Sequence, residues 1–178
     1  MSAGDHLPRA VEEIEAHVAD LGWDRPSALF ALVETAQLLA EQPELADALG
    51  LGVDATGLTP IEQEGLAPGE VLEEVLATII WPPAVVGAAA VVERIVLPPA
   101  TDGQIPEDPE EAEVFAREHP DREEVRIVAG VTRDGAAHCA LRLRSHDEPE
   151  SVVVGEDLVP NLVIALRATL QDDEEGSA

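Results

Sequence analysis

The chain has no lysine and no tyrosine, and Cys139 is its single cysteine. Without lysine it cannot form a Schiff base or supply a P-loop lysine, and without tyrosine it has no tyrosyl acid or nucleophile. A lone cysteine cannot close a disulfide within the chain. Aromatic residues make up 2% of the chain, so the core must come from Ala, Val, Leu and Ile.

Positive charge is also scarce. Ten arginines face 37 acidic residues, and the formal net charge is −27. The electrostatic field of such an acidic protein repels nucleic acids and anionic membranes. We therefore expect neither to be a partner. The longest apolar run, around Ile79–Val92, is interrupted by Pro82 and Pro83 and does not predict a transmembrane helix. Met1–Leu7 lacks the pattern of a signal peptide, which together with the lone cysteine predicts a cytoplasmic protein.

Apolar spacing predicts both helices and strands. Leu7–Leu21 has the three- and four-residue spacing of an amphipathic helix. Ala28–Val33 and the valine-rich Ala84–Leu97 are typical of buried strands, although both leave a buried helix open. Pro60 restricts a strand at Leu58–Glu64 to a sheet edge. Further helices are expected at Glu34–Glu41, Pro43–Leu49, Gly69–Ile80, after the capping residue Asp108, and at Leu158–Leu170, with a short strand at Ser151–Val154.

Asp134-Gly135 predicts the turn of a β-hairpin over Val125–Ser145. Apolar residues alternate along both strands, and only a three-residue loop places them on one face, because a one-residue slip turns every side chain over. This register opposes Arg126 to Arg142 on the other face and puts Gly135 at positive φ. It also pairs Ile127 with Leu141, Glu124 with Arg144 and Gly130 with His138, and it places Cys139 on the core face.

The hairpin concentrates positive charge. It carries four of the ten arginines against one acid, Asp134, for a local charge of +3. Opposed arginines repel each other, which predicts an anionic neighbour. The simpler explanation is that acids of the same chain, or solvent alone, satisfy the arginines, because charged residues on strands usually mark a solvated face. The alternative is a bound partner. The candidate partner- or ligand-binding residues are Arg126, Arg142, Arg144 and His138, with Arg133 at the turn.

No motif for catalysis or metal binding accompanies these residues. The five histidines lack HxxxH spacing and there is no CxxC, so we expect no catalytic residue, no metal and no cofactor. A Cys139 nucleophile with a histidine base remains an alternative, although a thiol on a core face is usually inert. Trp23 and Trp81 stand at element ends beside prolines, where we expect them to cover the core, with a ligand platform as the alternative.

Three stretches carry a family resemblance. They are Gly22–Leu39 (GWDRPSALFALVETAQLL), Leu76–Pro99 (LATIIWPPAVVGAAAVVERIVLPP) and His119–Leu170, which includes HPDREEV, the Arg-Asp-Gly turn, LRLR and DLVPNL. Over most of its length the chain resembles a family of small acidic actinobacterial proteins of unknown function. The resemblance implies an actinobacterial cytoplasmic protein and carries no site residues.

We therefore expect an α+β fold, a mainly antiparallel sheet of four to six strands with helices packed on it. One domain is expected over residues 1–170, followed by a disordered acidic tail over 171–178. The expected function is a non-enzymatic adaptor or regulatory protein that binds another protein or itself. The alternative is a small-anion or ligand-binding protein, or an enzyme, that uses the arginine-lined face of the sheet.

Overall fold

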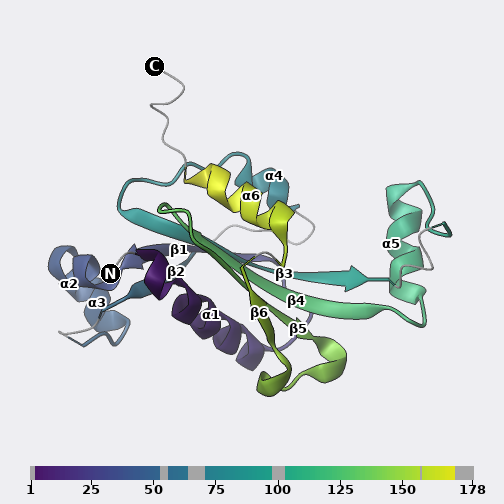
Figure 1. Ribbon diagram of the computed structural model, residues 1–178, viewed down its shortest axis with the longest axis horizontal. Helices are drawn as coiled ribbons and strands as arrows, with labels where there is room; N and C mark the ends of the chain where they lie inside the picture. Colours follow the sequence, from purple (N-terminus) through teal and green to yellow (C-terminus); the bar gives the residue numbers. More distant parts are fainter. Residues whose placement is uncertain (1–2, 53–55, 64–70, 98–102, 157, 171–178) are drawn as a thin grey trace, which may run out of the picture.

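Six antiparallel strands form one sheet in the order β2-β1-β3-β4-β5-β6 (Figure 1). The computed structural model describes residues 3–52, 56–63, 71–97, 103–156 and 158–170. The predicted α+β class and a sheet of up to six strands are confirmed. The strands are β1 Ala28–Glu34, β2 Leu58–Gln63, β3 Val85–Val96, β4 Glu123–Thr132, β5 Ala137–Leu143 and β6 Val153–Gly155. The α-helices are α1 Leu7–Leu21, α2 Thr35–Glu41, α3 Pro43–Ala48, α4 Leu72–Leu76, α5 Pro109–Glu118 and α6 Pro160–Thr169. The 3-10 turns are η1 Ala3–His6, η3 Arg144–His146 and η4 Pro149–Ser151.

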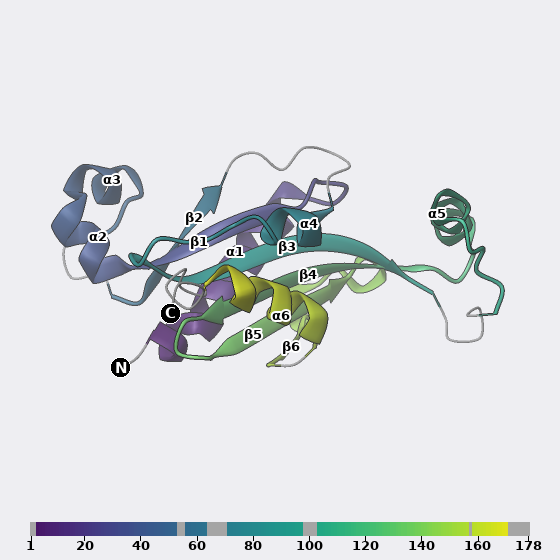
Figure 2. The ribbon, with the colours of Figure 1, turned by 90° about the horizontal axis from the view of Figure 1, so that it is seen from above.

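Helices cover both faces of the sheet (Figure 2). On one face α1 buries the apolar stripe that its spacing predicts, including Leu7, Val11 and Ile14, against residues such as Phe30 and Val128. On the other face α4 and α6 pack over a second apolar cluster. Among the described residues, no helix combines the length and the apolar character needed to cross a lipid bilayer.

β3 lies inside the sheet, and from Val85 to Val92 it is buried on both faces, as the apolar run predicts. Its Ala88, Ala89 and Ala90 have no exposed surface. β1, the other segment for which a helix was left open, pairs with β3 on one side and with β2 on the other. Propensity alone favoured a helix for β1, and sheet pairing on both sides overrides it. The edge position of β2 with Pro60 is confirmed.

The hairpin of β4 and β5 has the predicted register. Ile127 pairs with Leu141 and Arg126 with Arg142. Gly135 has φ of 95°, and the N–H of Thr132 donates to the carbonyl of Ala136 across the three-residue loop. Cys139 is fully buried in the apolar cluster beneath α6.

Several element ends differ from the expectations. α4 covers only Leu72–Leu76 of the helix predicted at Gly69–Ile80, and residues 64–70 of that region lie outside the described ranges. α6 begins at Pro160, because the residue before a proline is kept out of the helical region and Val159 has φ of −137°. Ser151 belongs to η4, so β6 starts at Val153. The tail predicted at 171–178 lies outside the described residues.

One part of the fold stands apart from the sheet and its helices. The ends of β3 and β4 continue as a two-stranded arm, and α5 lies at its tip (Figures 1 and 2). As predicted, Asp108 caps α5 by accepting a hydrogen bond from the N–H of Glu110 at 3.0 Å. No residue of α5 is buried.

Gly87 provides a test of the tight strand packing. A Cβ atom at this position would lie 2.5 Å from the backbone oxygen of Val131 and 3.1 Å from Leu32. The backbone oxygen cannot move without disturbing β4, so Gly87→Ala is expected to lower the free energy of unfolding by about 2 kcal/mol. Gly52→Ala is the control, because nothing lies within 4 Å of a Cβ there. Equal urea midpoints for both variants would contradict this packing.

Candidate functional site

Glu15 of α1 and Arg142 of β5 form a buried ion pair. The Nε and Nη2 atoms of Arg142 donate to the two carboxylate oxygens of Glu15 at 3.0 and 2.7 Å. Their side chains are only 6% and 7% exposed. The hydrogen bonds with Glu15 raise the pKa of Arg142. Such two-point pairing fixes the position of α1 over the hairpin.

Arg126 lies beside this pair with fewer partners. Its side chain is 1% exposed, and its Nη2 donates to the carbonyl of Gly22 at 2.8 Å. Nη1 is 4.0 Å from Glu15, and neither Nη1 nor Nε has a hydrogen-bond acceptor within the described parts of the chain. Burial lowers the pKa of Arg126. Its guanidinium carbon stacks 4.3 Å from the ring centre of Trp23, and this cation–π contact compensates part of the lost hydration.

Asp147, just after β5, joins the ion pair to Trp23. One of its oxygens accepts from Nη1 of Arg142 at 3.0 Å and the other from the indole N–H of Trp23 at 3.1 Å. The hydrogen bond from Trp23 and the one from Arg142 hold the pKa of Asp147 below its ordinary value of 3.8. Trp23 is half-buried here and engages charged groups on several sides.

Arg144 holds the turn that follows α1. It donates to both oxygens of Asp24, at 2.9 and 3.0 Å, and to Glu124 at 3.2 Å. The hydrogen bonding from Arg144 lowers the pKa of Asp24. Asp24 has φ of 65°, an unfavourable conformation for a residue with a side chain, and its N–H donates to Glu93 at 2.9 Å. The turn is thus held by Glu93 of β3 and by Arg144 of η3, which Glu124 of β4 also contacts.

The electrostatic balance of this cluster is negative. Three arginines, Arg126, Arg142 and Arg144, face five carboxylates of the same chain. Three positive and five negative groups give the cluster a net formal charge of −2. Acids of the same chain therefore neutralise the positive charge of these hairpin arginines. The carboxylates are those of Glu15, Asp24, Glu93, Glu124 and Asp147.

The other two hairpin candidates lie elsewhere. His138 shares the α1 face, but it is four residues from Arg142 along an extended strand, about 13 Å away. Its Nε2 is buried with no hydrogen-bond partner among the described residues. Arg133 binds backbone carbonyls, including those of Val85 at 2.7 Å and Trp81 at 3.1 Å. The structure brings Arg126, Arg142 and Arg144 together and leaves His138 and Arg133 outside the cluster.

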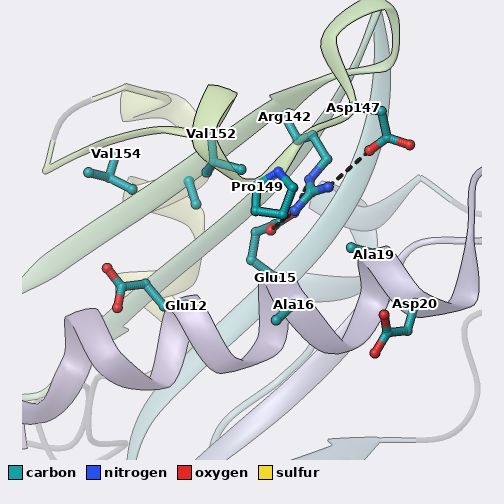
Figure 3. A pocket seen from close by; sticks show the side chains of 11 residues that line it. Glu12, Glu15, Ala16, Ala19, Asp20, Arg142, Asp147, Pro149, Val152 and Val154 are labelled. Atoms are coloured by element: carbon teal, nitrogen blue, oxygen red, sulfur yellow. Dashed lines mark hydrogen bonds and ion pairs between the residues drawn. The ribbon is translucent and has the colours of Figure 1, made fainter.

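A groove of about 590 Å³ opens beside the cluster, between α1 and the β5–β6 segment (Figure 3). The ion pair of Glu15 and Arg142 lies at its centre. Glu12 and Val154 stand at one end, and Asp20 and Asp147 at the other (Figure 3). Ala16, Ala19, Ala140, Pro149 and Val152 complete the lining.

Neither the groove nor the cluster has the arrangement of a metal site. In the ranges that the structure describes, no three His, Cys, Asp or Glu side chains gather closely enough to hold a metal ion.

Of the five acids in the cluster, the sequence identified only Glu124, whose predicted pairing with Arg144 is confirmed at 3.2 Å. Glu15 carried a signal, because it lies four residues after Val11 and three before Val18, on the buried stripe of α1. A charged residue on an apolar stripe indicates a buried partner. Asp24 and Asp147 carried no comparable signal among the 37 acids.

The fold and the cluster define the class: an α+β protein whose antiparallel sheet holds an internal network of arginines and carboxylates. The chain belongs to the PPA1309-like protein family, whose model matches residues 7–171. No curated protein and no solved structure shows a significant match to the chain.

Glu15→Gln tests the central ion pair. The change removes the one carboxylate that two buried guanidinium groups share, so we expect the free energy of unfolding to fall by about 3 kcal/mol. Glu13→Gln is the matched control, since Glu13 pairs with Arg9 in solvent, with side chains 51% and 85% exposed. That variant should change stability by less than about 0.5 kcal/mol in urea unfolding. Comparable losses for both variants would rule out a special role for Glu15.

Asp147 makes a pH-dependent contribution to stability. Because folding lowers its pKa below 3.8, the contribution is complete above pH 3.8 and is lost as the pH falls through the folded-state pKa. The stability difference between wild type and Asp147→Asn should therefore be constant near neutral pH and shrink below pH 3.8. Asp121→Asn, at an exposed position, should show no such difference in thermal unfolding between pH 2 and pH 7. A difference for Asp147→Asn that persists at pH 2 would contradict the assignment.

Proposed function

We propose that this chain is a non-enzymatic adaptor or regulatory protein of the actinobacterial cytoplasm, and that α5 is its docking element for another protein. The observation that carries the proposal is the place of α5, at the tip of the β3–β4 arm with no residue buried (Figure 1). The cellular setting rests on the lone cysteine and the sequence resemblance.

The helix is stabilised locally rather than by the sheet. Asp108 caps its first turn, Pro109 occupies the first helical position, and Arg117 pairs with Glu113 one turn earlier. A ten-residue helix is only marginally stable in water without packing. The cap therefore supplies stability that packing against the sheet does not, while the surface of α5 stays exposed.

The surface of α5 combines apolar and acidic groups. Val114 is 51% exposed, and Ile105, just before the helix, is 37% exposed. The helix also carries four glutamates. An apolar contact flanked by acids fits an apolar groove with a basic rim, in the helix-in-groove manner. A second copy of so acidic a chain would be repelled, which favours a different protein as the partner.

The arginine face is not the docking surface of this proposal. The partner- or ligand-binding role predicted for Arg126, Arg142, Arg144 and His138 remains a prediction, as does the alternative of a ligand-binding protein or enzyme. Internal carboxylates already hold Arg142 and Arg144. Binding an outside anion there would have to displace them.

Val114→Asn tests docking by α5. Losing the burial of a valine side chain should weaken partner capture about tenfold. Ile164→Asn is the matched control, an exposed aliphatic residue on α6 with 62% of its surface accessible. Tagged wild type and both variants are incubated with actinobacterial lysate, and the captured proteins are quantified by mass spectrometry.

The expected result is at least one protein held by wild type and Ile164→Asn and lost with Val114→Asn. Melting temperatures should match, because Val114 packs against no core. Identical capture profiles for all three proteins, or equal losses in both variants, would overturn docking by α5.

A further inference from the structure

The groove between α1 and the β5–β6 segment contains two carboxylates with no internal partner. Glu12 and Asp20 are exposed on α1 and make no hydrogen bond or ion pair with any described residue. The other two acids of the lining, Glu15 and Asp147, are engaged by Arg142 (Figure 3). Four acids and one arginine give the lining a net formal charge of −3. The two ends of the groove, at Glu12 and Asp20, therefore favour a positively charged ligand group.

The distance between these carboxylates matches an extended peptide. Eight residues of α-helix separate Glu12 from Asp20, a rise of about 12 Å. In an extended chain, residues i and i+4 point to the same side and lie about 13 Å apart. Two cationic side chains at that spacing can therefore meet both carboxylates at once, whereas a single ion cannot bridge them.

The middle of the groove suits an apolar side chain. Ala16 and Ala19 lie on α1 between the two acids, and their short side chains leave room (Figure 3). Val152 and Pro149 form the opposite wall. Residue i+2 of an extended peptide points to the same side as i and i+4, so an apolar residue there would fill this space.

The neighbouring sheet edge can extend the contact. β5 is the one described strand that pairs with β6. Val153 and Val154 are 53% and 49% exposed, so neither face of β6 is covered. An incoming strand can pair with the free backbone groups of β6, although three residues provide few bonds. Charge and the apolar centre must therefore supply most of the selectivity.

We propose that this groove binds an extended segment of another protein with a basic residue, an apolar residue two positions later and a second basic residue two positions after that. The site goes beyond docking by α5, because no residue of α5 lines it and either site can exist without the other.

The proposal is tested with labelled synthetic peptides and the full chain. The probe is fluorescein-Ser-Arg-Ser-Val-Ser-Arg-Ser, and the isomer fluorescein-Ser-Arg-Ser-Val-Arg-Ser-Ser has the same charge with its arginines on opposite sides of an extended chain. Fluorescence anisotropy is measured at about 0.15 M salt, where long-range attraction is screened. We expect the first peptide to bind at least about fivefold more tightly than the isomer. Equal affinities would overturn the proposal.

Protein variants locate the binding. Glu12→Gln with Asp20→Asn should weaken the first peptide about tenfold, since two exposed ion pairs are lost. Glu44→Gln with Asp47→Asn makes the same change at exposed positions of α3 and should leave binding unchanged. Equal weakening by both double variants would show attraction to the net charge alone and would overturn the site.

Two further measurements separate the alternatives. Spermidine carries spaced positive charges without an apolar side chain, and displacement of the peptide at equal concentration would overturn selectivity for a protein segment. Val114→Asn should bind the peptide like wild type. That result keeps the groove distinct from docking by α5, and a loss of binding in this variant would contradict two independent sites.

Discussion

The pairing of Glu15 with two opposed arginines is the interaction on which this structure depends. The hairpin register forces Arg126 and Arg142 to face each other on the side of the sheet that α1 covers. Without Glu15, the buried Arg126 would lose the carboxylate that lies 4.0 Å from it, and Arg142 would keep only Asp147, whose side chain is 45% exposed. Packing α1 there would then leave buried positive charge poorly compensated. Glu15 supplies that carboxylate from the apolar stripe itself, so the polar network and the hydrophobic core dock the same helix.

This arrangement determines which surfaces remain for partners. The only concentration of positive charge on the hairpin is used within the fold, and Trp23 is engaged by Arg126 and Asp147. Exposed apolar residues remain on α5 and around β6, in a chain where 37 acids outnumber ten arginines. Both proposed contacts therefore point to basic partners, and in the groove the one lining arginine, Arg142, is already paired with Glu15 and Asp147.

Much of the fold follows from local pattern. Parity alone selected the three-residue loop, because a two-residue loop would have paired Ile127 with Arg142 and mixed apolar and charged residues on each face. Continuous apolarity identified β3, since only a strand covered on both faces needs it. Helix ends were predicted less well. The stripe of Val75, Leu76 and Ile79 continues past the end of α4, where Thr78 donates its hydroxyl hydrogen bond to the carbonyl of Val75.

The sequence by itself determined the exclusions of chemistry, the faces of the strands and the opposition of Arg126 to Arg142. Only the tertiary structure decided what meets those arginines. Periodicity assigns a side chain to a face, but it does not choose a partner 127 positions away, as Glu15 is from Arg142. With 37 acids in the chain, that choice depends on how α1 crosses the sheet, which is set by long-range packing. The same crossing leaves Glu12 and Asp20 facing an open groove.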